Sequence, residues 1–191
     1  MDIRKIAATK ITDPLVPFLD KIGLTPNALT SIGFVITIIA AVFIAIGNFL
    51  IGALLILFAG LFDILDGALA RYAKKSTRFG ALFDSTLDRL SEGILFVGLV
   101  VFYSNGVHML EIILLFVVMI FSFLISYIRA RAEGLNIDCQ TGLFTRTERV
   151  LLLALGLLVD QVLIALILLA LFTFVTVIQR VFYVWKNTRQ E

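Results

Sequence analysis

The chain has 191 residues, of which 60% are hydrophobic and 16% charged, and its mean hydropathy is +1.05. A soluble domain of this length needs more polar residues to cover its surface, so the composition excludes an ordinary water-soluble protein and indicates a bilayer as the solvent. The net charge of +2 gives no reason to expect a nucleic-acid partner, and a single cysteine, Cys139, excludes an internal disulfide. The length fits one domain over residues 1–191.

Residues 1–24 are predicted to form an interfacial amphipathic helix instead of a span. Apolar side chains recur at helical spacing on both sides of Asp13 and Pro14, a pair that restarts a helix by capping it and fitting its first turn. Gly23 is expected to end this helix, and Thr25 and Pro26 to start the next one. The apolar positions of the second stripe are Leu15, Phe18, Leu19 and Ile22.

The rest of the chain, residues 25–186, is predicted to be an all-α, polytopic bundle of six transmembrane helices. The first four expected spans are residues 27–46, 49–72, 81–103 and 109–128. Residues 150–179 would extend about 45 Å as one helix, longer than a hydrocarbon core of about 30 Å. We therefore expect a break at Asp160, which gives a short fifth span and a sixth.

The basic residues predict the orientation of this bundle. In the six-span arrangement all 16 lysines and arginines fall on one side, and the three opposite turns contain none. Because basic residues are retained on the cytoplasmic side, both termini and the basic helix ends are predicted to be cytoplasmic. The chain is thus expected to be a multi-pass protein of the cytoplasmic membrane, surrounded by membrane lipids.

Four carboxylates interrupt the apolar pattern at one level of the predicted bundle. Asp63 and Asp66 are three residues apart near the end of the second span, and Asp84 and Asp88 are four apart near the start of the third. These spacings place each pair on one helix face, and the two antiparallel helices bring the faces together. An acid in a membrane helix costs about 2.5 to 3.5 kcal/mol, so a compensating cation is expected. Oxygen-only ligands favour Mg²⁺ or Mn²⁺.

Small and basic residues beside these acids indicate the kind of ligand. Gly67, Ala70 and Gly80 leave room next to the predicted ions. Arg71 follows Asp63 by just over two helical turns, which places its guanidinium on nearly the same face. Because guanidinium groups and divalent cations both bind phosphate oxygens, the pattern indicates a pyrophosphate site.

The run from Asp63 through Asp66, Gly67, Ala70 and Arg71, followed by Gly80, Asp84 and Asp88, resembles the complete motif of the CDP-alcohol phosphotransferase family. The resemblance implies that an alcohol attacks the lipid-linked phosphorus of a CDP-lipid and that CMP leaves. It also implies two divalent ions, Mg²⁺ or Mn²⁺, and a homodimer.

The resemblance assigns roles to individual residues. Asp63, Asp66, Asp84 and Asp88 would be the metal ligands, and Asp88 would also be the catalytic general base. The CDP-lipid site would consist of Asp66, Gly67, Ala70, Arg71 and Gly80.

The acceptor is indicated by arginines at three further cytoplasmic helix ends. Arg129, Arg149 and Arg180 together suit a phosphate on the acceptor, although positive-inside anchoring would also explain each of them. The segments around them are similar to the phosphatidylinositol-phosphate synthase branch, with Arg129 where that branch has a lysine. This similarity implies inositol 1-phosphate as the acceptor and either CDP-diacylglycerol or CDP-archaeol as the donor.

Other functions stay open at this point. Glycerol 3-phosphate is the main rival acceptor, which would make the chain a phosphatidylglycerophosphate synthase. A membrane prenyltransferase also uses Asp-rich metal sites, but it would need two Asp motifs far apart in sequence. A transporter or an inactive assembly partner would be expected to lack at least one motif aspartate, and all four are present.

Overall fold

The computed structural model describes residues 15–188, and the regular secondary structure of this part of the chain is entirely helical, without strands. Residues 15–21 are helical and precede six longer helices. Their bounds are α2 Pro26–Ala45, α3 Phe49–Tyr72, α4 Arg78–Tyr103, α5 Met109–Glu133, α6 Arg146–Leu158 and α7 Val162–Thr188. The all-α prediction is therefore confirmed for the described residues.

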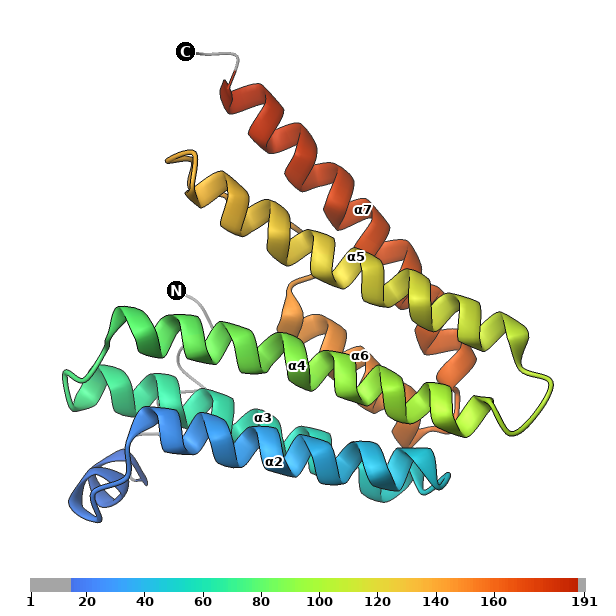
Figure 1. Ribbon diagram of the computed structural model, residues 1–191, viewed down its shortest axis with the longest axis horizontal. Coiled ribbons are helices and arrows are strands. Elements are labelled where there is room, and N and C mark those ends of the chain that lie inside the picture. The colour runs from blue at the N-terminus through green and yellow to red at the C-terminus, as the bar shows by residue number, and fades with distance from the viewer. Residues whose placement is uncertain (1–14, 189–191) are drawn as a thin grey trace.

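The helices form a bundle in two parts, which Figure 1 shows from one side. Helices α2, α3 and α4 lie side by side, whereas α5 packs on α7 and leans away from them. The short helix α6 contacts both α3 and α7 and so joins the two parts. Short turns join α2 to α3, α3 to α4 and α4 to α5 and make these neighbours antiparallel, so the end of α3 and the start of α4 lie at the same end of the bundle.

The helix boundaries agree with the predicted spans where the sequence is apolar. Helix α3 has the predicted bounds, and the predicted break at Asp160 is confirmed, since α6 ends at Leu158 and α7 begins at Val162. Asp160 itself has a φ of 55°, which a helix interior does not allow. Helices α4, α5 and α7 extend beyond the predicted spans at their charged ends, because hydropathy marks the edge of the bilayer and not the end of a helix.

Four helices are long and apolar enough to cross a membrane, namely α2, α3, α5 and α7, and they identify a membrane protein. Helix α4 carries many charges in its first half. Helix α6 has 13 residues and a length of about 20 Å, which is shorter than the hydrocarbon core of a bilayer.

The predicted helix starts can be followed in the hydrogen bonds. The side chain of Thr25 accepts a hydrogen bond from the amide of Ala28 at 3.2 Å and caps α2. At α6, Glu148 accepts from the amide of Thr145 at 2.9 Å and completes a capping box. Gly23 follows the helical residues 15–21 with a φ of 78°. The rest of the predicted interfacial helix, including Asp13 and Pro14, lies outside the described residues.

One close approach fixes the packing of α4 against α2. A Cβ atom on Gly98 would lie 2.6 Å from the carbonyl oxygen of Ala41, so only glycine fits this position. The hydrophobic core around this contact consists of buried side chains from α3, α4, α6 and α7, among other helices. They include Ile56, Leu95, Leu99, Leu153, Leu157, Leu166 and Leu169. The contact thus holds α4, and the carboxylates that it carries, against α2, which in turn packs on α3.

Replacing Gly98 with Ala is expected to destabilise the protein by about 1 to 3 kcal/mol, because the added methyl group forces two helix backbones apart. Thermal unfolding in detergent measures this loss. Gly93→Ala on the same helix is the matched control, since its Cβ would meet only Phe123 at 3.8 Å. Equal stability of the two variants would contradict the close approach.

Candidate metal centre and active site

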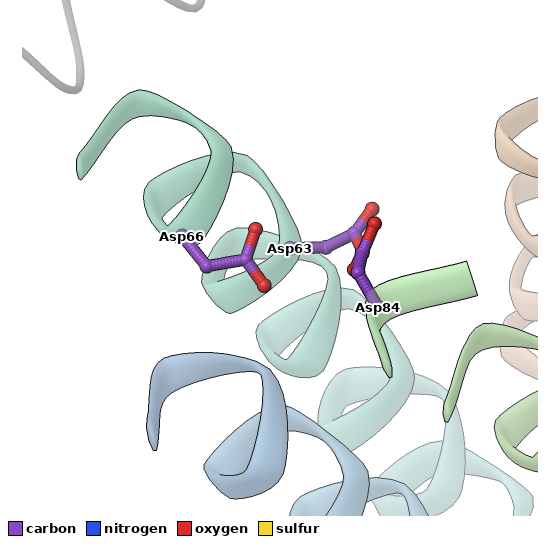
Figure 2. A group of neighbouring side chains, drawn as sticks. All are labelled: Asp63, Asp66 and Asp84. Atoms are coloured by element: carbon purple, nitrogen blue, oxygen red, sulfur yellow. The ribbon is translucent and has the colours of Figure 1, made fainter. Parts of the chain in front are cut away.

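Three of the four predicted carboxylates converge where the C-terminal part of α3 lies beside the N-terminal part of α4. Asp63, Asp66 and Asp84 each offer one carboxylate oxygen, and these oxygens all lie within 4.8 Å of one another. Figure 2 shows the three side chains turned toward a common space. The convergence follows from the helical spacing of Asp63 and Asp66 on one helix and the antiparallel placement of the other.

The residues present fit a divalent cation. The Oδ1 atom of Asp84 is buried and has no hydrogen-bond partner. Asp66 is 6% exposed, and its Oδ2 accepts a hydrogen bond of 2.6 Å from the hydroxyl of Thr30. A buried oxygen without a partner is costly, and three converging carboxylates repel one another, so a hard cation would relieve both problems. The all-oxygen donor set suits Mg²⁺ or Mn²⁺.

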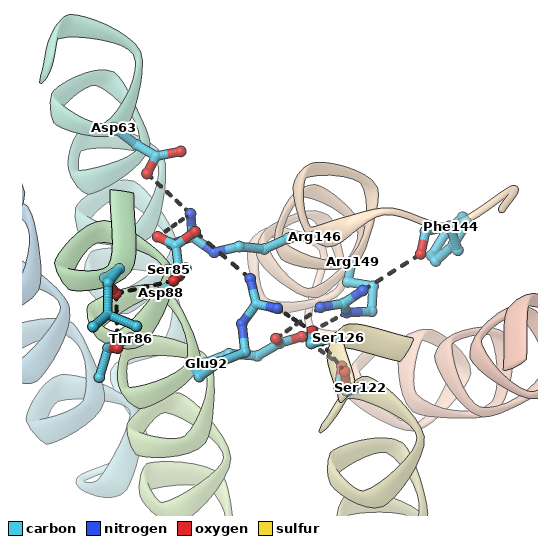
Figure 3. Close-up of polar contacts among 12 residues, drawn as sticks. Asp63, Ser85, Thr86, Asp88, Glu92, Ser122, Ser126, Phe144, Arg146 and Arg149 are labelled. Atoms are coloured by element: carbon cyan, nitrogen blue, oxygen red, sulfur yellow. Dashed lines mark hydrogen bonds and ion pairs between the residues drawn. The ribbon is translucent and has the colours of Figure 1, made fainter. Parts of the chain in front are cut away.

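Asp88, the fourth predicted ligand, faces arginines in this structure. The Nη1 atom of Arg146 lies 2.5 Å from Asp88 Oδ1 and 3.0 Å from Asp63 Oδ1. A second guanidinium, that of Arg89, lies 3.6 Å from the other oxygen of Asp88. Figure 3 shows Arg146 reaching from the start of α6 to both carboxylates.

Sequence reasoning missed this role of Arg146, which it counted only among the cytoplasmic basic residues. The signal that would have found it is the spacing of Arg146 and Arg149, three residues apart on one helix face. It also missed Thr30, because a threonine in an apolar span has no pattern that marks it as a partner of an aspartate.

A second polar layer lies one helical turn deeper. Arg149 and Glu92 are 2% and 3% exposed, and the guanidinium donates to both carboxylate oxygens at 2.6 and 2.9 Å. The hydroxyl of Ser122 donates to the same carboxylate at 2.7 Å, and Arg89 donates to Ser126. These contacts, drawn in Figure 3, connect α4, α5 and α6; Glu92 and Arg149 satisfy each other, whereas Nε of Arg89 is buried without a hydrogen-bond partner.

The other two predicted acceptor arginines lie nearby in different surroundings. Arg180 is 4% exposed, and its guanidinium donates to the backbone carbonyls of Thr141 and Ile125 at 2.9 and 2.5 Å. Arg129 is exposed and pairs with Glu133 at 2.9 Å. Arg180 lies within electrostatic reach of Arg129 and Arg149. The three arginines thus belong to one region, although only Arg129 is exposed.

The predicted CDP-lipid residues occupy the adjoining surface of α3 and α4. A Cβ on Gly67 would lie 3.4 Å from Arg71 Nη1, so the guanidinium passes over the glycine. A Cβ on Gly80 would lie 3.0 Å from the hydroxyl of Thr77, which caps α4. Ala70 lies between Gly67 and Arg71 on the partly exposed surface of α3.

A cavity of about 550 Å³ connects the carboxylates to the apolar interior. Asp63, Asp66, Asp88, Glu92 and Arg146 contribute its charged lining. The remaining wall is mainly apolar and comes from α2, α3, α4 and α6. Its members include Phe34, Ile56, Leu57, Leu61, Leu95 and Val150. Such a cavity accepts a ligand that is charged at one part and hydrocarbon at another.

These features define a membrane-embedded enzyme whose acidic cluster serves a ligand with both polar and apolar parts. Residues 23–185 match the family model of CDP-alcohol phosphatidyltransferase, and the chain belongs to this family. It is accordingly a transferase, and the resemblance seen in the aspartate motif is confirmed.

Similar proteins include an archaetidylinositol phosphate synthase of Methanothermobacter thermautotrophicus, 35% identical over 91% of this chain and 89% of the relative. A phosphatidylinositol phosphate synthase of Mycobacterium marinum is 35% identical over 97% of this chain and 84% of its own.

Solved structures of the phosphatidylinositol phosphate synthase of Mycobacterium tuberculosis have the same fold. One with CDP-DAG bound has a TM-score of 0.84 at 34% identity and covers 92% of this chain and 94% of that one. Another, in complex with manganese and citrate, has a TM-score of 0.84 at 33% identity and covers 91% and 88%.

Replacing Thr30 with Val is expected to weaken Mn²⁺ binding about ten- to a hundredfold, because the hydroxyl that orients Asp66 is lost. Titration of the purified protein with Mn²⁺ measures the affinity. Thr37→Val is the matched control, since the Thr37 hydroxyl bonds only the carbonyl of Gly33 in its own helix, at 3.0 Å. Unchanged affinity in the Thr30 variant would show that Asp66 needs no such support.

Proposed function

We propose that the chain transfers a phosphatidyl-type group from a CDP-lipid to a hydroxyl of inositol 1-phosphate and releases CMP. The observation that carries this proposal is the group of carboxylates from α3 and α4 beside a cavity that is charged in one part and apolar in another. The similar enzymes named for inositol-phosphate lipids support the same acceptor.

The donor fits the two kinds of cavity wall. The apolar wall suits a lipid chain, and the carboxylates with their ions suit the diphosphate. The CDP-DAG bound in the mycobacterial structure supports a CDP-lipid here. Asp66, Gly67, Ala70, Arg71 and Gly80 would contact the cytidine and the diphosphate, with Arg71 donating to phosphate oxygens. CDP-diacylglycerol and CDP-archaeol share this part of the molecule.

The motif carboxylates would hold two divalent ions, Mg²⁺ or Mn²⁺, with Asp63, Asp66, Asp84 and Asp88 as ligands. When bound, these ions supply charge stabilisation to the transferring phosphoryl group. Asp88 lines the cavity and would accept the proton of the acceptor hydroxyl. The hydroxyl oxygen then forms the new bond to phosphorus, the bond from that phosphorus to the CMP oxygen breaks, and CMP takes the electron pair.

The phosphate of the acceptor would bind in the region of Arg129, Arg149 and Arg180. Arg129 is exposed and is available for direct contact. Arg149 and Arg180 are buried and hold Glu92 and two backbone carbonyls. The charge of Arg180, which no carboxylate neutralises in the contacts above, would favour an anion, and Arg149 would shape the pocket around it.

The position of the charged site also bears on how the bundle lies in the membrane. We propose that α4 and α6 also cross the membrane, which gives six spans, and that the N-terminal amphipathic helix lies on the cytoplasmic leaflet. Charged residues gather at the bundle end that holds the carboxylates, which supports a cytoplasmic active site and cytoplasmic termini in the cell membrane. A homodimer is the expected assembly, from the family resemblance.

A direct assay tests the reaction. Purified protein is given CDP-diacylglycerol with inositol 1-phosphate, glycerol 3-phosphate, free inositol or serine, and CMP release is followed. Inositol 1-phosphate is expected to be the best acceptor, and EDTA to abolish turnover until Mg²⁺ or Mn²⁺ is restored. If glycerol 3-phosphate is the preferred acceptor, the proposal of inositol 1-phosphate is wrong. Full activity in EDTA would exclude the metal-dependent mechanism.

The acceptor arginines make a second prediction. Replacing Arg129 with Ala is expected to raise the acceptor KM about ten- to a hundredfold while the donor KM changes little, because a charge-assisted contact of about 1.5 to 3 kcal/mol is lost. Arg149→Ala and Arg180→Ala should raise the same KM and also lower the unfolding temperature, since both side chains are buried. Arg131→Ala, an exposed residue on the same helix as Arg129, is the control. Unchanged KM values in all three variants would favour simple membrane anchoring.

A further inference from the structure

Arg146 contacts carboxylates of both metal-bearing helices. Its Nη1 lies 3.0 Å from Asp63 Oδ1 on α3 and 2.5 Å from Asp88 Oδ1 on α4. Asp63 also belongs to the three-carboxylate group that fits a divalent cation. The guanidinium is therefore ion-paired with Asp63 and Asp88, two of the four carboxylates that would hold the ions, as Figure 3 shows.

The neighbouring Arg149 forms a fully hydrogen-bonded ion pair with Glu92 and serves as a comparison for Arg146. Its Nε and Nη2 donate to Glu92, its Nη1 lies 3.4 Å from the carbonyl of Phe144, and the side chain is 2% exposed. Buried ion pairs are stable only when their remaining donors are also satisfied. Arg149 meets this condition.

Arg146 does not meet it. Its Nε is buried without a hydrogen-bond partner, and one nitrogen, Nη1, makes the contacts to both carboxylates. Its side chain is 23% exposed and lines the cavity of about 550 Å³, so the guanidinium has space into which it can move. The capping box and the ion pair between Glu92 and Arg149 anchor the start of α6. The Arg146 side chain can therefore change its position without a movement of the helix.

We propose that Arg146 is a displaceable internal counter-ion. It pairs with Asp63 and Asp88 while no divalent cation is bound, and it leaves them when the ions bind. This inference rests on the proposed metal-dependent function. A guanidinium and a divalent cation compete for the same carboxylate oxygens and repel each other, so Arg146 weakens metal binding and protects the empty site from carboxylate repulsion.

The first test measures Mn²⁺ affinity without substrate. Wild-type protein and Arg146→Gln are titrated in detergent, and free Mn²⁺ is followed by electron paramagnetic resonance. Arg146→Gln is expected to bind Mn²⁺ at least about tenfold more tightly, because the competing charge is gone. Arg146→Lys keeps the competing positive charge and should remain within about threefold of the wild type. Arg131→Gln, which removes an exposed charge from the end of α5, should match the wild type.

The second test measures thermal stability with EDTA and with saturating Mn²⁺. Arg146→Gln should unfold at a lower temperature than the wild type in EDTA and at the same temperature in Mn²⁺. Arg149→Gln should be destabilised in both conditions, because its ion pair with Glu92 is independent of the ions. If Arg146→Gln folds poorly, it is expressed and purified with Mn²⁺, and the ion is then removed by dialysis.

The possible results separate the two proposals. If the wild type binds Mn²⁺ and Arg146→Gln binds it equally well or more weakly, the displacement of Arg146 is wrong and the proposed function stands. An Arg146→Gln protein that fails to fold even with Mn²⁺, or a lysine variant that binds as tightly as the glutamine variant, also overturns it. If the wild type does not bind Mn²⁺ at all, both proposals fail.

Discussion

Charge compensation inside an apolar bundle is the constraint on which the rest of this structure depends. Carboxylates of α3 and α4 meet arginines of α4 and α6 in a chain of which 60% is hydrophobic. The carboxylates are Asp63, Asp66, Asp84, Asp88 and Glu92, and the arginines are Arg89, Arg146 and Arg149. Each isolated charge would be costly in the membrane, so the helices must hold these groups against one another or against bound ions.

The compensation has two layers with different character. In the deeper layer, Glu92, Arg149 and Ser122 satisfy one another and hold three helices together. In the layer around Asp63, Asp84 and Asp88, Asp84 Oδ1 and Arg146 Nε are buried without hydrogen-bond partners, as is Nε of the adjacent Arg89. The deeper layer supports the fold, whereas the incomplete layer is where a ligand changes the balance of charge. The proposed binding of ions and diphosphate would complete this layer.

The short helix α6 links the two layers. Its first turn carries two arginines three residues apart, Arg146 facing the aspartates and Arg149 facing Glu92. The capping box at Thr145 fixes the start of the helix and therefore the positions of both arginines. Because α6 packs on both α3 and α7, it also joins the two parts of the bundle. The proposed acceptor region includes Arg180 of α7, so it adjoins the same helix that carries Arg146 toward the carboxylates.

The sequence alone determined the helical class, the break at Asp160 and the convergence of Asp63, Asp66 and Asp84. These depend on local hydropathy and on the 3.6-residue repeat, which relate residues close together in the chain. Only the tertiary structure decided that Arg146 pairs with Asp63 and Asp88, that Glu92 pairs with Arg149, and that Thr30 supports Asp66. Those partners are separated by 36 to 83 residues, and the choice among many arginines depends on how the helices pack. Helix periodicity gives the face on which a charge lies, but the neighbour that neutralises it is set by packing between helices.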